Sequence, residues 1–290
     1  MATVTVLAPG KVNLTLDILG VLPNGYHEME MLMHAVSLEI TLTLTEIEGD
    51  EILVSCSDPA VPLGEKNLVY KAAKAFFAHC GKSIGVSVHI EKKVPREAGM
   101  AGGSADAAGM LVGLDRLMGT GFSLEELCGI GVKIGADVPF CLVGGAALVK
   151  GIGEKITPLS PLRDGWLVAA KPSVGVKTAG CFARYDALTE VVHPDTAAAK
   201  SAIERQDLTA LGSLLENVLE QAADLPSTEA LRKEMLSAGA LGARMTGSGS
   251  VVFSLFEDKA SAEKCIEALS SLKAATYLLR FVPYGAHVIG

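Results

Sequence analysis

The glycine-rich stretch from Pro95 to Ala105, Pro-Arg-Glu-Ala-Gly-Met-Ala-Gly-Gly-Ser-Ala, constrains this chain most. Glycines let backbone N–H groups converge on an anion, because no Cβ stands in the way. The small residues from Ser104 to Met118 predict a helix packed closely on a sheet, and a helix N-terminus carries partial positive charge. The stretch therefore predicts a phosphate-binding loop. It matches neither of two known phosphate-binding patterns, Gly-x-x-x-x-Gly-Lys-Ser/Thr and Gly-x-Gly-x-x-Gly. The alternative interpretation is therefore a turn with a purely structural role.

Composition and charge narrow the class of protein. The 290 residues are 49% hydrophobic and 20% charged, which is typical of a globular chain. No apolar run approaches the ~18 residues of a membrane helix, so we expect a cytoplasmic protein without a membrane partner. The net charge of -8 and the lack of a basic stripe argue against nucleic acid as a main partner. A phosphate site must then supply positive potential locally. The six cysteines lack zinc-ligand spacing and are expected to be buried or incidental thiols.

Hydrophobic periodicity predicts a mixed α+β chain. Residues 51–55 are expected to pair with the long strand 31–45. Gly151 and Gly153, followed by two prolines, mark a break, so we expect domains at 1–155 and 156–290. The expected strands are 3–8, 12–21, 31–45, 85–91, 144–150, 166–170, 250–256 and 275–283. The expected helices are 68–79, 104–118, 124–134, 178–187, 195–204, 208–221 and 228–237.

Two polar pairs lie upstream of the loop. Lys11 and Asn13, in Pro-Gly-Lys-Val-Asn-Leu, are one residue apart, so in an extended chain they point to the same side. Together they suit a phosphate or a substrate hydroxyl; the alternative is a surface lysine at a strand turn. Tyr26 and His27, in Asn-Gly-Tyr-His-Glu, combine an aromatic face with a titratable ring. They suit a nucleobase or sugar, or else form an exposed hairpin tip.

Two further segments lie downstream. Asp137, in Gly-Ala-Asp-Val-Pro-Phe, follows a predicted helix and is a candidate general base for a hydroxyl nucleophile. A helix-cap or turn aspartate is the alternative. The stretch from Met245 to Gly249, Met-Thr-Gly-Ser-Gly, is a second glycine–hydroxyl loop. It suits a supporting role at a phosphate or a plain turn.

In this order and at these distances, the five segments resemble the GHMP kinases, the family of galactokinase, homoserine kinase, mevalonate kinase and phosphomevalonate kinase. The likeness spans residues 5 to about 256. Gly-Tyr-His-Glu together with Ala-Asp-Val-Pro-Phe resembles the branch that phosphorylates a cytidine diphosphate sugar alcohol on the non-mevalonate route to isopentenyl diphosphate. The resemblance implies an α+β, two-domain GHMP kinase architecture. Its N-terminal domain is ribosomal protein S5 domain 2-like, and its C-terminal domain is ferredoxin-like.

The resemblance also implies residue roles. Asp137 is expected to be the catalytic base, with Lys11 beside it holding the nucleophile and base in place. Asn13, Tyr26, His27 and Phe182 are expected to bind the substrate: His27 hydrogen-bonds the cytosine, Tyr26 forms a wall, and Phe182 stacks on the base, although Tyr185 could replace it. ATP is the expected phosphate donor, with Mg²⁺ held by Ser104. The loop is expected to bind the nucleotide through Pro95, Arg96, Glu97, Ala98, Gly99, Met100, Ala101, Gly102, Gly103, Ser104 and Ala105. Lys66 and Asn67 are candidates for the adenine.

The loop departs from the usual family pattern in a few places. Gly10 stands where alanine is usual, Met100-Ala101 replace Leu-Gly, and Ala105-Asp106 replace Ser-Asn. Asp106 adds negative charge near the phosphates, so we do not expect it to contact them. Two alternatives stay open: a sibling kinase for another alcohol, such as homoserine or mevalonate, and a non-catalytic ligand sensor. The presence of both Lys11 and Asp137 argues against a pure sensor.

Overall fold

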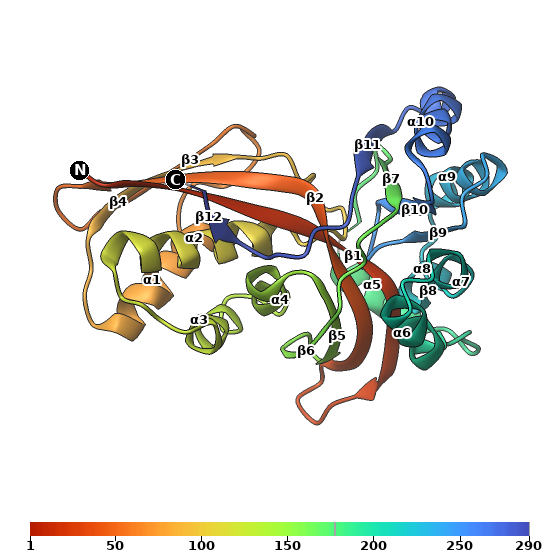
Figure 1. Cartoon of the computed structure of the whole chain (residues 1–290). Helices are drawn as coiled ribbons and strands as arrows, with labels where there is room; N and C mark the ends of the chain where they lie inside the picture. Colours follow the sequence, from red (N-terminus) through yellow and green to blue (C-terminus); the bar gives the residue numbers. More distant parts are fainter. Residues whose placement is uncertain (177, 290) are drawn as a thin grey trace.

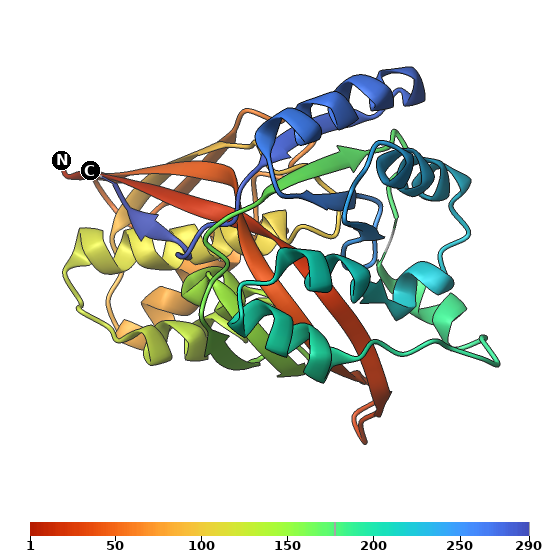
Figure 2. The same ribbon diagram turned by 45° about the vertical axis from the view of Figure 1, so that its right-hand side comes forward.

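Two long antiparallel strands, β1 (Thr3–Val21) and β2 (His27–Ile47), run through the whole molecule. In the computed structural model, which describes residues 1–176 and 178–289, they extend from the side of the molecule where both chain termini lie to a projecting hairpin that joins them (Figures 1 and 2). β1 replaces the two strands expected at 3–8 and 12–21. The pairing continues past Pro9 because a register shift between Pro9 and Gly10 accommodates the missing N–H of proline.

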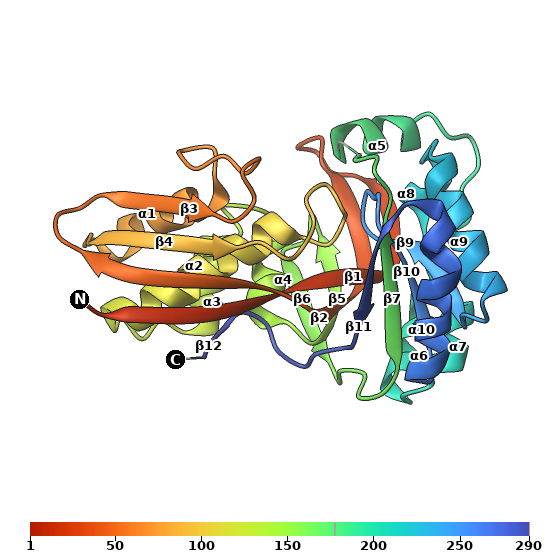
Figure 3. The same ribbon diagram turned by 90° about the horizontal axis from the view of Figure 1, so that it is seen from above.

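The described residues contain an eight-stranded larger sheet built on this pair. Its main path is β12-β1-β2-β4-β3; β5 also pairs with β2, β6 with β5, and β8 with β1. Helices α1 to α4 cover one face of this sheet (Figures 1 and 3). The remaining bounds here are β3 (Ile52–Cys56), β4 (Gly85–Glu91), β5 (Ala146–Gly151), β6 (Lys155–Leu159), β8 (Glu216–Asn217), β12 (His287–Val288), α1 (Leu68–Cys80), α2 (Gly102–Met118), α3 (Leu124–Gly131) and α4 (Val138–Val143).

The smaller sheet has the strand order β11-β7-β10-β9. All its pairs are antiparallel, and this order across a β–helices–β–β–α–β sequence is the ferredoxin-like arrangement, as expected. Helices α9 and α10 cover its outer side (Figure 3), whereas α6 packs against α7 and β2. The bounds are β7 (Trp166–Lys171), β9 (Gly242–Met245), β10 (Val252–Phe256), β11 (Ala275–Leu279), α5 (Thr178–Tyr185), α6 (Thr196–Glu204), α7 (Leu208–Ser213), α8 (Val218–Gln221), α9 (Pro226–Ser237), α10 (Lys259–Ala268) and a 3₁₀ turn, η1 (Leu269–Leu272).

Two sequence-based expectations about pairing and breaks are wrong. Residues 51–55 do not pair with β2, because β4 pairs with residues 41–47 of β2 and β3 runs parallel to β4. Gly151 and Gly153 form the turn of the β5–β6 hairpin instead of a break between strands. β6 tolerates Pro158 because it pairs only with β5 at the edge.

The strand pairing also bears on how the domains divide. The boundary expected after residue 155 falls inside β6, which belongs to the larger sheet. The last strand, β12, returns to pair with β1 of the same sheet. The C-terminal segment therefore lies with the N-terminal half of the molecule, as the adjacent termini in Figure 1 show.

Helix α2 carries the predicted loop at its N-terminus, and its small residues explain its position. Ala105, Ala107 and Ala108 are fully buried against the strands. Short side chains let the helix axis approach the sheet, which fixes where the helix begins. None of the described helices has the length and apolar character required to cross a membrane.

Candidate active site

A cavity of about 1190 Å³ lies where the two halves of the molecule meet. It brings together most of the residues predicted from the sequence: Lys11, Asn13, Tyr26, His27, residues 95–104, Asp137 and Phe182 all line it. The second glycine loop contributes Gly247, Ser248 and Gly249. Segments that are 230 residues apart in the sequence therefore share one site. Ala105 differs from its neighbours, because it is buried inside α2 and is not among the lining residues.

The N-terminus of α2 opens into this cavity. Its N-cap residue, Ala101, has φ of 56° and makes no side-chain capping hydrogen bond, so the first N–H groups of the helix remain available to a ligand. Gly102, Gly103 and Ser104 form the first turn. Met100 is buried in the core, where it fills the place of the usual leucine, and Ala98 is buried as well. Only the backbone of these two residues can serve a ligand. The arrangement is that of an anion site at a helix N-terminus.

Lys11 and Asn13 point to the same side of β1, as predicted. The Lys11 ammonium donates to Asn13 Oδ1 at 2.6 Å and to the Gly99 carbonyl at 2.8 Å. An ammonium has three N–H donors, so a third is left for a ligand. Burial lowers the pKa of Lys11, and the negative charge of Asp137 acts in the opposite direction. This lysine is part of the site rather than a surface residue.

Asp137 precedes α4 and lines the cavity. Its side chain makes no capping hydrogen bond to that helix, so the structure does not use it as the cap residue that was its structural alternative. Its carboxylate acts on the Lys11 ammonium through space. A carboxylate and an ammonium thus face one cavity whose wall is a helix N-terminus.

The aromatic side of the site is built from both halves. The ring of Phe182, on α5, stacks on the ring of His27 with a centroid distance of 4.8 Å and an interplanar angle of 28°. Tyr185 meets the same imidazole edge-on at 6.3 Å. Tyr26 lies at the hairpin tip with 62% of its surface exposed. Phe182 therefore already covers one face of His27, while Tyr26 stands open at the cavity edge.

The second glycine loop packs directly against the first. A Cβ on Gly99 would lie 1.9 Å from the Thr246 carbonyl oxygen, so only glycine allows this approach. The Thr246 hydroxyl donates to Asn13 Oδ1 or to the Gly99 carbonyl and accepts from the Asn13 N–H. Ser250 N–H and Val251 N–H donate to the carbonyls of residues 97 and 98. Thr246 thereby joins β1 and both loops.

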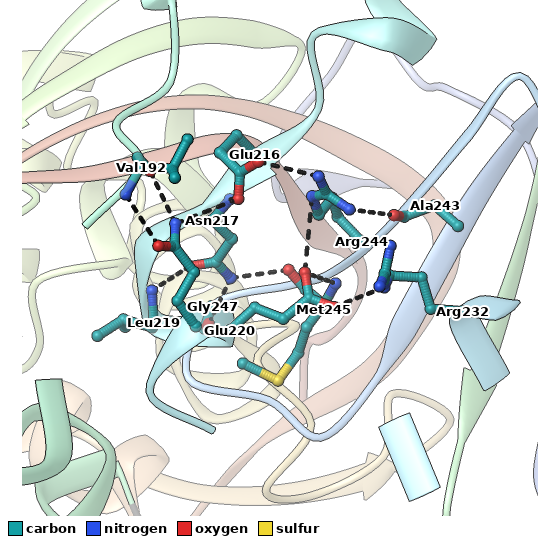
Figure 4. Close-up of polar contacts among 11 residues, drawn as sticks. Val192, Glu216, Asn217, Leu219, Glu220, Arg232, Ala243, Arg244, Met245 and Gly247 are labelled. Carbon is teal, nitrogen blue, oxygen red and sulfur yellow. Dashed lines mark hydrogen bonds and ion pairs between the residues drawn. The ribbon is translucent and has the colours of Figure 1, made fainter. Parts of the chain in front are cut away.

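Asn217 holds this second loop from behind. Its Nδ2 donates to the Met245 and Gly247 carbonyls at 2.8 and 2.9 Å, and its Oδ1 accepts from the Leu219 N–H (Figure 4). The side chain is fully buried. Beside it, an ionic network connects Glu216 and Glu220 with Arg232 and Arg244. Asn217 also interrupts the helix expected over 208–221, because β8 pairs with β1 at this point and α8 begins after it.

A buried ion pair holds the first loop from behind. Lys92 Nζ donates to Asp106 Oδ2 and, at 2.8 Å, to the Gly102 carbonyl. Both side chains are buried. Burial raises the pKa of Asp106 to about 6, and the nearby Lys92 ammonium opposes that shift. Asp106 thus has a buried partner below the loop, which explains how the chain tolerates an acid at this position.

Other residues predicted to bind nucleotide have protein partners of their own. Arg96 lines the cavity, but its guanidinium pairs with Asp58 at 2.9 Å. Asn67 caps α1, accepting from the Val69 N–H and donating to the Pro62 carbonyl. Lys66 and Asn67 both line the cavity next to the first turn of α2. Lys66 is exposed, whereas Asn67 is buried.

A divalent cation has one plausible kind of site here. Among residues 1–176 and 178–289, no cluster of three His, Cys, Asp or Glu side chains could hold a metal by itself. Mg²⁺ is usually bound through one or two protein oxygens together with phosphate oxygens and water. The Ser104 hydroxyl, in the first turn of α2 at the cavity wall, fits that pattern.

Sequence reasoning missed three residues that organise the site. Lys92 lies directly upstream of the loop. It could have been noticed as a basic residue able to pair with the acidic Asp106. Asn217 could have been noticed as a cap-forming residue inside a predicted helix. Asp186, which bonds His27 at 2.8 Å, carries no signal that sequence alone would reveal.

Family models match both halves of the chain: "GHMP kinases N terminal domain" over residues 67–145 and "GHMP kinases C terminal" over residues 199–275. A relative from Carboxydothermus hydrogenoformans, 4-diphosphocytidyl-2-C-methyl-D-erythritol kinase, is 42% identical over 97% of this chain and 97% of its own length. The same-named protein of Clostridium tetani is 40% identical over 95% of this chain and 99% of its own.

Solved structures agree with these matches. A crystal structure of 4-(cytidine 5'-diphospho)-2C-methyl-D-erythritol kinase superposes with a TM-score of 0.79 at 31% identity, covering 95% of this chain and 98% of that one. Homoserine kinase from Cytophaga hutchinsonii superposes with a TM-score of 0.80 at 21% identity, covering 100% and 98%. The second likeness concerns the fold alone.

Proposed function

The chain belongs to the GHMP kinase family, and from this membership we infer that it transfers phosphate from ATP to the 2-hydroxyl of 4-diphosphocytidyl-2-C-methyl-D-erythritol, a step of the non-mevalonate route to isopentenyl diphosphate. The relatives that are 40–42% identical over nearly the whole chain carry this activity in their name. The chain is accordingly a kinase that acts on an alcohol group.

One observation supports the mechanism most directly. Lys11, Asn13, Asp137 and the N-terminus of α2 meet in a single cavity, with the aromatic pair His27 and Phe182 on its other side. Phosphoryl transfer requires positioning and charge stabilisation more than covalent chemistry. A cavity that combines an anion site, a buried ammonium and an uncommitted carboxylate meets these requirements.

Each of these groups has a separate role in phosphoryl transfer. The N–H groups of Gly102, Gly103 and Ser104 bind the β- and γ-phosphates at the helix N-terminus. Asp137 orients the substrate hydroxyl and takes its proton as the oxygen bonds to the γ-phosphorus and the bond to the leaving ADP oxygen breaks. Lys11 is held rigidly by Asn13 and Gly99 and stabilises the charge on the transferred group.

Mg²⁺, when bound with the nucleotide, would neutralise charge on the β- and γ-phosphates. Ser104 is the residue placed to hold it. The net charge of the chain is -8, so the local positive groups of the cavity, Lys11, Lys66 and the N-terminus of α2, must outweigh a repulsive overall field.

The cytidyl part of the substrate is assigned to the aromatic side. His27 presents its ring to the base, Phe182 or Tyr185 contributes stacking surface, and Tyr26 forms a wall at the cavity edge. Asn13 contacts the erythritol hydroxyls next to the reacting centre. Of these residues, Asn13, Tyr26, His27 and Phe182 line the cavity and Tyr185 does not, which favours Phe182 as the stacking residue.

The central test is an ATP-consumption assay with 4-diphosphocytidyl-2-C-methyl-D-erythritol on wild type, Asp137→Asn, Lys11→Ala and His27→Ala. Loss of the base should lower kcat by about 10²–10⁴-fold. His27→Ala should act mainly on KM for the cytidyl substrate. Full activity of Asp137→Asn would show that this carboxylate is not the base.

A panel of other alcohols separates sibling activities and a pure sensor. Homoserine and mevalonate should accept phosphate no faster than the background, because neither presents a base to His27 and Phe182. Phosphorylation of either at the rate of the cytidyl substrate would contradict the assignment. Absence of turnover with every alcohol, despite ATP binding, would instead favour the sensor.

A further inference from the structure

The imidazole of His27 is held by a second residue that the mechanism above does not use. Its Nε2 lies 2.8 Å from Oδ1 of Asp186, just after α5. The His27 side chain is 16% exposed and Asp186 is 52% exposed, and both line the cavity. The contact joins the β1–β2 hairpin to α5, so it crosses between the two halves of the molecule.

The chemistry of this contact determines which hydrogen-bonding face His27 offers to a ligand. An ionised carboxylate only accepts hydrogen bonds, so the proton must reside on Nε2. In the neutral ring, Nδ1 then carries a lone pair and acts as an acceptor. Phe182 packs on one face of the ring and Tyr185 on its edge, which restricts the ring to this orientation.

The helix that Asp186 directly follows, α5, is itself firmly attached. Cys181 is fully buried and its thiol faces the Leu219 carbonyl, while Arg184 Nε donates to the Ala222 carbonyl at 3.1 Å. The Asp186 N–H donates to the Phe182 carbonyl. Asp186 therefore meets His27 from a fixed position rather than from a freely moving chain.

We propose that Asp186 is a positioning residue that makes the cavity selective for a pyrimidine bearing an exocyclic amino group, by fixing His27 with Nδ1 as a hydrogen-bond acceptor. The proposal rests on the proposed function, since it names what the aromatic side of the same site reads. An acceptor at Nδ1 suits the amino group of cytosine. It faces a carbonyl oxygen in uracil, and two acceptors cannot bond each other.

A second histidine–carboxylate contact supplies a matched control. His193 Nδ1 bonds Asp17 Oδ1 at 2.7 Å and ties the same segment to β1. Neither residue lines the cavity. A change at His193 should loosen the segment as much as a change at Asp186 does, yet it leaves the tautomer of His27 untouched.

The experiment measures CDP and UDP binding by calorimetry on the full chain, for wild type, Asp186→Ala, Asp186→Asn, Asp186→Glu and His193→Gln. Wild type should prefer CDP, and Asp186→Ala should lower the ratio of the two affinities about tenfold, the weight of one hydrogen bond between neutral groups. Asp186→Asn should also lower it, because an amide can donate as well as accept and no longer dictates the tautomer. Asp186→Glu should restore part of the preference.

Imidazole nitrogen shifts of His27 provide a readout that a merely structural role would not move. The Nε2–H form should dominate in wild type and in His193→Gln, and it should lose its dominance in Asp186→Ala. An unchanged affinity ratio in Asp186→Ala, or a ratio that falls equally in His193→Gln, would overturn the proposal. Failure of wild type to phosphorylate the cytidyl substrate would instead contradict the proposed function, because nucleotide binding is measured without turnover.

Discussion

The two glycine loops of the cavity touch each other, yet they are built for different tasks. The first, residues 95–104, leads into the N-terminus of a 17-residue helix, so its N–H groups share one direction and a partial positive charge. The second, Met245 to Gly249, leads into β10 and has no helix behind it. The first loop is therefore suited to bind phosphate, and the second to hold the first loop and β1 in place through Thr246.

The side chains that support the two loops from below also differ in chemistry. A buried lysine–aspartate pair, Lys92 and Asp106, holds the first loop, whereas a neutral amide, Asn217, holds the second. A buried charged pair carries no net charge, but taking both of its groups out of water costs free energy. A neutral support avoids that cost. The comparison implies that the first loop depends on pH and the second does not.

The largest effect is expected from Lys92→Met, which leaves the Asp106 carboxylate buried without its partner. Removing one member of a buried pair costs about 3–5 kcal/mol of unfolding free energy. In the variant the pKa of Asp106 should rise above the value of about 6 in wild type, and it is near 4 in the unfolded chain. The folded variant thus binds more protons, so its deficit should shrink as the pH falls from 7 to 5.

Urea unfolding at pH 7 and at pH 5 measures this deficit. Lys93→Met is the control, because Lys93 is the exposed neighbour of Lys92 and its loss should change stability by no more than about 0.5 kcal/mol. A deficit of Lys92→Met that is the same at both pH values would show that Asp106 does not depend on this lysine.

A smaller effect is expected from Asn217→Ala, which leaves the Met245 and Gly247 carbonyls and the Leu219 N–H without their partner. The free energy of unfolding should fall by roughly 1–3 kcal/mol, and this decrease should not vary between pH 5 and 7. Asn217→Asp separates the two roles of this residue, because it retains the acceptor for Leu219 but cannot donate to the two carbonyls. If Asn217→Asp equalled wild type in stability and in KM for ATP, the support of the loop would lie elsewhere.

Gly247→Ala should lower the free energy of unfolding by less than Asn217→Ala does. Gly247 has φ of 56°, a region that costs an L-residue about 1–2 kcal/mol. The added Cβ would also lie 3.0 Å from the Gly99 carbonyl oxygen, so the contact between the loops must loosen. Thermal unfolding should show the loss, and KM for both substrates should rise. An unchanged KM would mean that the distance between the loops does not matter to the site.

The smallest change in stability is expected from Gly103→Ala, in the first turn of α2. An alanine here would meet only the flexible end of Leu68, at 3.2 Å, and alanine stabilises a helix by roughly 0.5–1 kcal/mol relative to glycine. Stability should stay level or rise, while ATP binding, measured by calorimetry, weakens because the methyl group stands where the phosphates approach. ATP binding as tight as in wild type would remove this turn from the phosphate site.

These same residues show which structural features could be predicted from the sequence. The alternation around Lys11 and Asn13 predicted their shared direction correctly, because side-chain direction in a strand is a local property with a period of two. The loop and α2 were predicted correctly as well, because a glycine-rich turn and the small residues that follow it are also local features of the sequence. The single helix expected over 208–221 was wrong, because the pairing of β8 with β1 overrode a helical pattern.

Pairings between distant segments were beyond such reasoning. The sequence placed Glu51 to Ser55 beside β2, but β4 takes that position in the sheet. Asp186 gave no signal, because its meaning depends on lying 2.8 Å from a histidine 159 residues earlier in the chain. Asp106 was noted only as a negative charge near the predicted phosphate site, and the structure shows that it forms a buried ion pair with Lys92.

The sequence by itself determined the loop, its helix, the lysine and amide on one side of β1, and the carboxylate at Asp137, since each follows from local periodicity, backbone freedom or a short motif. Only the tertiary structure decided that Thr246 joins the two loops, that Lys92 and Asn217 support them, and that Asp186 orients His27. Most of those contacts link segments far apart in the chain. Lys92 and Asp106 are only 14 residues apart, but their pairing depends on how α2 packs on the larger sheet, which no local pattern of residues specifies.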